Sequence, residues 1–545
     1  MADTNLLPSS YGRPESPKEK SVTNKLLFAT IVACFGSLQY GYHMAELNAP
    51  QSVLSCHTTG TDNAMSDPLY YSLGLKNCVA MSEQQIGLIT SVFSIGGLFG
   101  SLYAGVLADI HGRRKISFFN AFLSILGSLL LTFSNSFTQF LIGRLTCGLA
   151  AGSSVVVTPL LLTEIAPNNL KGALGSMNQV SINLGILLTQ VLSLKWATIN
   201  QWRNILFVGV ILATINFILL FKVHESPKWL VNRGYLDEAE DVLRGLRGGT
   251  RADTRNEINE WLSVRSVSRT QLSKQQDENN NNGSNSNLVM LGPSPANNTK
   301  QNNKKDSSYQ SLHARSTSPL VSAHSNREFE ENEEIKEISM WQYIKSNHYN
   351  KSRFMITMIL MGQQFVGINS IICYGVKVIG DLVSEGNTAI IVNVGISILN
   401  VVVTFASSPL IDKWGRKPLL IGSSFSMGLS SLFISYGLKA NSAQLLIFFT
   451  FLYIGVFAIG MGPIPFLVIS ELTPDEAIGA AQSYGTTCNW IAVFIVAYGF
   501  PVLDSIIGIS PIFIIFGVVA FLFSIFVYYR FPETKGRSTK VGLWD

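Results

Sequence analysis

The stretch Asp109-Ile-His-Gly-Arg-Arg114 reveals how this chain is organised, because it returns in the second half of the sequence as Asp412-Lys-Trp-Gly-Arg-Lys417. Two further signatures follow each copy at nearly the same offset. Glu164-Ile-Ala-Pro167 returns as Glu471-Leu-Thr-Pro474, and Glu225-Ser-Pro-Lys228 returns as Glu533-Thr-Lys-Gly536. Because the order is the same in both halves, the sequence predicts two repeats of like orientation.

The composition indicates a chain that lies mostly in lipid. Of the 545 residues, 47% are hydrophobic and only 14% are charged, whereas a soluble domain carries about 25% charged residues. The net charge of +5 is too small to suggest a nucleic-acid partner. The N-terminal segment is hydrophilic, and no short apolar stretch with a cleavage site follows it, which argues against a secreted enzyme.

Membrane spans can be sought as runs of about 18 or more residues without Asp, Glu, Lys or Arg. The sequence predicts an all-α polytopic membrane protein with twelve transmembrane helices in two six-helix halves, because lipid requires every backbone polar group to be satisfied within the helix. The twelve apolar runs are 26–45, 84–108, 116–143, 145–163, 172–194, 204–221, 354–376, 386–411, 418–438, 440–470, 477–503 and 505–529.

Lys and Arg gather in the connections that follow even-numbered spans, which places these connections and both termini in the cytoplasm. The segments are then a cytoplasmic N-terminal segment (1–25), a first half (26–222), a cytoplasmic loop (223–352), a second half (353–530) and a cytoplasmic tail (531–545). The loop begins with apolar residues at helical spacing, Leu236, Ala239, Leu243 and Leu246, and 335–349 can form another amphipathic helix. Its Asn/Ser-rich middle is expected to be a disordered linker; a phosphorylated docking loop is the alternative.

Short motifs in a fixed order also make the chain resemble the sugar porters of the major facilitator superfamily, and within them the vacuolar sugar-porter-like proteins of fungi. The resemblance covers nearly all of the chain outside the termini and 250–335. It rests on Asn48-Ala-Pro-Gln51, Gly112-Arg-Arg114, Gly143-Arg-Leu145, Glu164-Ile-Ala-Pro167, Gly172-Ala-Leu174, Glu225-Ser-Pro227, Gln363-Gln364, Gly367-Ile-Asn369, Gly462-Pro-Ile-Pro465, Asn489-Trp490 and Pro532-Glu-Thr-Lys-Gly536.

The duplicated charges and the resemblance together imply a gate on the cytoplasmic side. Ion pairs across helices of the two repeats would hold that side shut; the alternative is that these charges only set the topology. Ile478 stands where the family carries an Arg, so the second network is expected to be incomplete. Gly462, Pro463 and Pro465 predict a broken, bendable helix. The charged motifs contribute Asp109, Gly112, Arg113, Arg114, Arg144, Glu164, Asp412, Gly415, Arg416 and Glu471.

The substrate site is expected to be uncharged, because the twelve runs hold amides where a charged substrate would need a partner charge. Amides both donate and accept, which suits the hydroxyl groups of a neutral sugar or polyol. Matching to the family implies that Gln179, Gln363, Gln364, Asn369, Asn400 and Asn489 bind the substrate, with Trp490, Tyr374 and Phe457 as flat walls. For Gln190 and Asn393 we favour contacts between helices, which is the alternative for every amide.

The resemblance also bears on the substrate and on coupling. Four polar or aromatic contacts of the glucose facilitators are replaced here, by Cys373, Ala458, Phe466 and Val493, which implies another hexose or a polyol. Proton-coupled members carry Asp at the position of His43, and facilitators carry Asn. His43 can titrate near neutrality, but the runs offer no carboxylate to share a proton with it. Facilitated diffusion is therefore favoured over proton symport, with a sugar sensor that transports nothing as the other alternative.

The remaining expectations concern the compartment and cofactors. Cys56 and Cys78 share the first non-cytoplasmic loop, where an oxidising lumen would allow a disulfide. The resemblance favours the vacuolar membrane, with the plasma membrane as the alternative. The spans hold no clustered catalytic groups, so we expect a carrier and no enzyme, cofactor or metal site.

Overall fold

The computed structural model describes residues 23–56, 70, 72–167, 170–262, 338–380, 382 and 388–535, and the regular elements in these ranges are helices. The first half consists of α1 (Asn24–Ala45), α2 (Gln51–Leu54), α4 (Glu83–His111), α5 (Arg113–Thr132), α6 (Phe137–Ile165), α7 (Lys171–Trp196), α8 (Trp202–Leu219) and η2 (Leu220–Lys222). Polar caps fix several starts: the Ser82 and Gln85 side chains cap α4 reciprocally, and Ser136 caps α6.

The second half repeats the six spans, but two of them are broken. Its elements are α13 (Asn350–Phe365), α14 (Ile368–Gly380), α15 (Thr388–Trp414), α16 (Arg416–Lys439), α17 (Ala443–Ile459), α18 (Ile464–Leu472), η5 (Asp475–Ala477), α19 (Ile478–Ile507) and α20 (Ile509–Arg530). The break between α17 and α18 falls in Gly460–Pro463, as the Gly/Pro pattern predicted. The break between α13 and α14 was not predicted; there Gly367 has φ +102°, a conformation that favours glycine.

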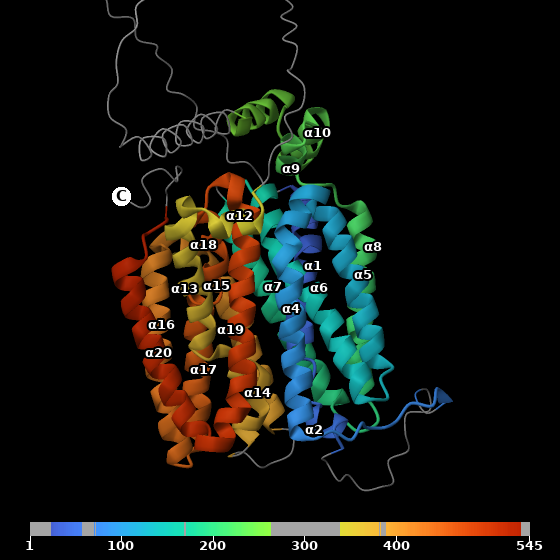
Figure 1. Ribbon diagram of the computed structural model, residues 1–545, viewed down its shortest axis with the longest axis vertical. Helices are drawn as coiled ribbons and strands as arrows, with labels where there is room; N and C mark the ends of the chain where they lie inside the picture. Colours follow the sequence, from blue (N-terminus) through green and yellow to red (C-terminus); the bar gives the residue numbers. More distant parts are fainter. Residues whose placement is uncertain are drawn as a thin grey trace, which may run out of the picture. The chain divides into compact units, whose positions relative to one another are not determined.

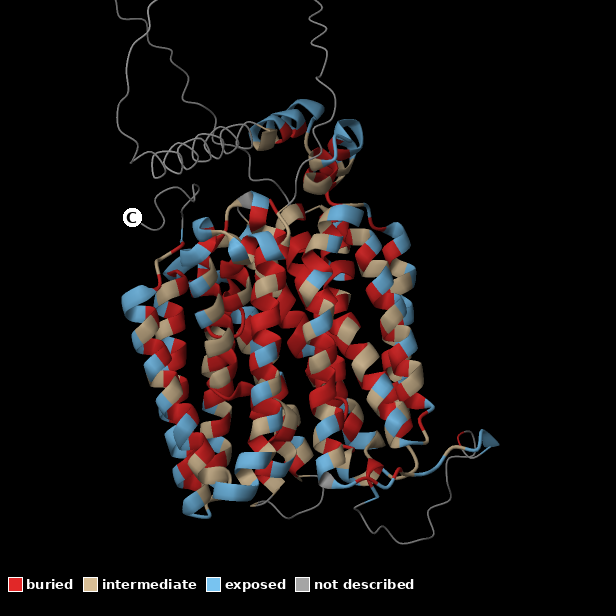
Figure 2. Ribbon diagram, viewed as in Figure 1, coloured by how far each residue is buried: buried red, intermediate tan, exposed pale blue. Residues whose placement is uncertain are grey.

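Eleven helical stretches of the described chain are long and apolar enough to cross a membrane. α1 is not among them, but its 22 residues take the place of the first predicted span. The two-half organisation of the major facilitator fold is therefore present, and the chain is a multi-pass membrane protein. Buried residues gather where helices face one another (Figure 2). Large apolar side chains such as Phe405 and Phe448 are each 62% exposed.

We name the two ends of the helix bundle after the features that they carry. The motif end carries the connections around Gly112 and Gly415, and the disulfide end carries α2 and Cys56 (Figure 1). Both described ends of the chain lie at the motif end, because Thr23 donates to the Leu246 carbonyl and Lys535 donates to the Lys413 carbonyl.

The connection between the halves forms short helices where it is described: α9 (Pro227–Asn232), α10 (Leu236–Arg247), α12 (Met340–Lys345) and η4 (Asn347–Tyr349). α10 confirms the helix predicted from apolar spacing, since Ala239, Leu243 and Leu246 are buried. The second amphipathic helix is split between α12 and η4. Residues 335–337 and the Asn/Ser-rich middle lie outside the described residues.

One span boundary predicted from the sequence is wrong. The predicted span 116–143 was taken to end before Arg144, the first charged residue after it. In the structure, α5 ends at Thr132 and α6 already begins at Phe137. Arg144 therefore lies two turns inside α6, near the disulfide end, and away from the motif end, where the sequence was expected to place it in a gate. A count of charge-free residues fails here because a buried partner, Glu46, allows the helix to carry a charge.

Candidate functional site

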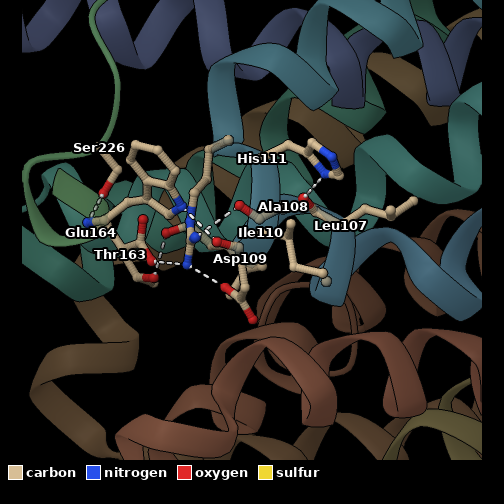
Figure 3. Close-up of polar contacts among 12 residues, drawn as sticks. Leu107, Ala108, Asp109, Ile110, His111, Thr163, Glu164 and Ser226 are labelled. Carbon is tan, nitrogen blue, oxygen red and sulfur yellow. Dashed lines mark hydrogen bonds and ion pairs between the residues drawn. The ribbon is translucent and has the colours of Figure 1, made fainter. Parts of the chain in front are cut away.

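The first of the duplicated charge motifs folds around the sharp turn between α4 and α5. Gly112 has φ +97°, and an added Cβ would lie 2.3 Å from a carboxylate oxygen of Glu225. The turn brings the buried Arg113 guanidinium within 2.7 Å of both Asp109 and Glu164. These two acidic side chains are labelled in Figure 3. Arg114 instead donates to the carbonyls of Leu220 and Phe221.

Glu225 closes this motif by capping the start of α5. Its carboxylate accepts from the backbone N–H groups of Arg113, at 2.8 Å, and Arg114, at 3.1 Å. The free N–H groups and the dipole of a helix start favour an anion there. Burial raises the pKa of Glu225, while the backbone N–H groups and Arg113 partly offset this.

The second half repeats this geometry residue for residue. Gly415 has φ +95°, Arg416 pairs with Asp412 at 3.3 Å and with Glu471 at 2.7 Å, and Glu533 accepts from the Arg416 N–H at 3.0 Å. The duplication inferred from sequence is thus a duplication of contacts. The Arg113 and Arg416 ion pairs each lie within one half, which differs from the expectation that they join the two repeats.

At the motif end, a carboxylate from each half lies against the first turn of a helix from the other half. A Cβ on Gly479, in the first turn of α19, would be 2.1 Å from Oδ2 of Asp109. A Cβ on Gly172, in the first turn of α7, would be 2.2 Å from Oδ1 of Asp412. Each carboxylate therefore reaches the positive end of a helix from the other half. Ile478, at the position of the family's Arg, packs against an apolar cluster of the first half.

Four of the predicted substrate amides form one network inside the second half. Gln363 donates to the carbonyls of Met461, at 2.7 Å, and Gly462, at 3.2 Å, which the break between α17 and α18 leaves free. Its own Oε1 accepts from Asn489 at 3.1 Å. Asn369 donates to Gln364 at 2.6 Å, and Gln364 donates to Gln363 at 3.4 Å.

The other two predicted amides take part in a chain that crosses between the halves. Gln179 donates to Asn183 at 3.2 Å, and Asn183 donates to Asn400 at 3.0 Å and to Thr404 at 2.9 Å. Sequence reasoning missed Asn183, although it lies one turn after Gln179 on α7. The amide inventory of α7 could have found it.

Aromatic rings from both halves meet at Trp490. Its ring packs edge-on against Tyr40 at 5.4 Å and Phe93 at 5.7 Å, two residues of the first half that were not predicted. The predicted wall residue Tyr374 instead stacks on Phe500 and donates to the Ala497 carbonyl. Phe457 packs beside Gly462 at the helix break.

A fully buried charge cluster lies between α1 and α6. Glu46 accepts from Arg144 at 2.9 Å and lies 3.0 Å from Nδ1 of His43, and each of the three side chains is at most 1% exposed. Arg144 also donates to the His43 carbonyl. The expectation that no carboxylate is available to His43 was wrong. The count missed Glu46 because this residue ended a charge-free run and was taken to lie outside the span.

The loop at the disulfide end is tied to the bundle at several points. Cys56 and Cys78 form a disulfide, the bond that the shared loop suggested. Trp202 donates to the Asn77 carbonyl, and Arg203 donates to the Lys76 carbonyl. On the same side, Asn48 of the first half donates to the Ile372 carbonyl of the second at 2.9 Å.

Comparison with known proteins identifies the family. The profile of the family described as "Sugar (and other) transporter" matches residues 29–281 and 287–541. The chain belongs to this sugar transporter family. It is 43% identical to a probable metabolite transport protein of Saccharomyces cerevisiae, over 100% of this chain and 99% of that one.

Other relatives of the transporter also match over nearly their whole length. It is 38% identical to vacuolar protein sorting-associated protein 73 of Saccharomyces cerevisiae, over 98% of this chain and 99% of the relative. It is 26% identical to facilitated glucose transporter member 2 of Gallus gallus, over 97% and 94%. The structure of the proton:xylose symporter XylE of E. coli superposes with a TM-score of 0.69 at 20% identity, over 96% and 99%, which establishes the shared fold.

Proposed function

We propose that this transporter carries a neutral hexose or polyol across the membrane by alternating access. The observation that supports this best is the pair of amide networks, one centred on Gln363 and one on Asn183, which contain no charged side chain. The buried charges of Glu46 and Arg144 are paired with each other. An anionic or cationic substrate would find no free counter-charge there, whereas amides suit hydroxyl groups.

Uptake into proteoliposomes that contain only this protein tests the proposal. A panel of radiolabelled hexoses, pentoses and linear polyols is offered, with protein-free liposomes as the control. Saturable uptake of at least one neutral compound, inhibited by an excess of the unlabelled compound, is the expected result. Uptake of an organic anion with no uptake of any sugar or polyol would contradict it. Saturable sugar binding without uptake would instead favour the sensor alternative.

Facilitated diffusion remains the mechanism that we propose first. Proton symport is a second candidate, and the contact between His43 and Glu46 favours it. An imidazole beside a carboxylate can share an exchangeable proton between its ring nitrogen and a carboxylate oxygen. Sugar uptake with a pH electrode in the same vesicles separates the two. If the protein is a facilitator, sugar uptake is accompanied by no proton movement, and the His43→Asn variant takes up sugar normally. Proton flux that accompanies sugar and disappears in both His43→Asn and Glu46→Gln would establish symport.

For the compartment we propose the vacuolar membrane, with the plasma membrane as the alternative. The support is the name of the relative that is 38% identical, which refers to vacuolar protein sorting. A fluorescent fusion in a fungal cell that co-localises with a vacuolar membrane dye is the expected result. Fluorescence at the cell periphery would place the transporter in the plasma membrane instead.

A further inference from the structure

A small cavity of about 20 Å³ lies in the seam between the two halves. Its walls come from α7 of the first half and from α14, α15 and α17 of the second. That volume has room for one water molecule or one hydroxyl group. The lining residues are four polar ones, Gln190, Asn393, Ser397 and Asn400, and the isoleucines Ile186, Ile371, Ile372, Ile396 and Ile454.

Gln190 is the unusual member of this lining. Its side chain is 2% exposed, and its Oε1 has no hydrogen-bond partner among the described residues. A buried amide oxygen without a partner is costly, so native structures rarely retain one that has no use. Asn393 donates to the Ala389 carbonyl one turn back on its own helix. The oxygen of Gln190 therefore does not form the interhelical bond that the sequence favoured.

The cavity adjoins the proposed substrate site. Asn400 lines the cavity and also accepts from Asn183, at 3.0 Å, in the chain that reaches Gln179. Gln190 lies on α7 about three turns beyond Gln179, on the side of the disulfide end. Because the cavity is walled by both halves, any rotation of one half against the other changes its width.

We propose that Gln190, with Asn393 and Ser397, binds one hydroxyl group of the carried sugar or polyol, next to Asn400. This rests on the proposed function and adds a contact to it. An unpartnered amide oxygen accepts from a hydroxyl donor. The five isoleucines fit the C–H surface of the substrate, and a carboxylate or phosphate would have no charged partner among the cavity's lining residues.

The test compares Gln190→Leu with the wild-type full-length protein in detergent, titrated with one hexose or polyol that the uptake panel has identified and with its monodeoxy analogues. Gln190→Leu is expected to lower the affinity for the parent compound about tenfold or more. The one analogue that lacks the hydroxyl bound by Gln190 is expected to bind wild type and variant equally. The ligand-free melting temperature should stay the same or rise, because the variant removes an unpartnered buried oxygen.

Asn216→Leu is the matched control. Asn216 is also buried with an unpartnered Oδ1 in the described chain, but it lines a different cavity inside the first half. Its affinities for the same compounds should equal those of wild type. If Gln190→Leu is not monodisperse, Ser397→Ala gives the same comparison.

Two results would overturn the proposal: unchanged affinity for the parent compound, or equal weakening of binding for every analogue. Unchanged affinity together with a lower melting temperature would identify Gln190 as a contact between helices. These results leave the proposed function intact. If the wild-type protein binds none of the sugars or polyols, the proposed function fails, and this subsite fails with it.

Discussion

At the scale of single residues, the amide network around Gln363 makes the clearest prediction. Gln363→Ala or Asn369→Ala should weaken substrate binding by about 1–3 kcal/mol, or roughly ten- to hundredfold, because each loses a bond to a substrate hydroxyl. Titration of purified, monodisperse variants measures this. Asn135→Ala, in the half-buried turn before α6, is the control. Wild-type affinity in both network variants would remove these amides from the site.

The buried pair of Glu46 and Arg144 gives a second prediction at this scale. Arg144→Met leaves the Glu46 carboxylate buried without its cation, and should lower stability by about 3–5 kcal/mol. Adding Glu46→Gln removes the uncompensated charge, so the double variant should regain much of the loss. Thermal melting of wild type and the two variants in detergent measures both effects. A double variant that melts below Arg144→Met would show that the two side chains do not act as a pair.

At the scale of elements, the contact between α4 and the start of α19 leaves no room for a methyl group. Gly479→Ala would place a Cβ 2.1 Å from the Asp109 carboxylate and should force the two helices apart at the motif end. We expect turnover to fall several-fold more than substrate affinity, because closure at this end is disturbed and the amides are untouched. Uptake rate and binding measured on one preparation test this.

Matched variants sharpen this element-scale prediction. Gly499→Ala on the same helix meets no atom within 4 Å, and should be neutral or slightly stabilising. Gly172→Ala, which would meet Asp412 at 2.2 Å, should reproduce the defect from the other repeat. Equal turnover in Gly479→Ala and Gly499→Ala would mean that the approach of Asp109 to α19 does not matter for the cycle.

At the scale of the whole molecule, the charge distribution predicts the orientation in the membrane. Thr23 and Lys535 lie at the motif end, which also carries most of the basic connections, so both termini should face the cytoplasm. Protease digestion of sealed, right-side-out vesicles should leave tags at both termini intact and remove them after permeabilisation. Digestion of either tag in sealed vesicles would contradict the topology.

The sequence by itself predicted the number of spans with one boundary wrong, the two repeats, the amides of the proposed site and the break at Gly460–Pro463. These follow from local chemistry. Lipid disfavours an unpaired charge in a span, Pro removes a backbone bond wherever it stands, and a repeated motif is visible without a structure.

Tertiary structure alone decided which side chains meet. The count of charge-free residues excluded Glu46 and misplaced Arg144, because the burial of a charge depends on a partner from another helix. The same holds for the approach of Asp109, on α4, to Gly479 in the first turn of α19, and for Gln190. An Asn or Gln in a sequence is equally compatible with a contact between helices and with a ligand site. Only packing shows that the Gln190 oxygen is buried without a partner.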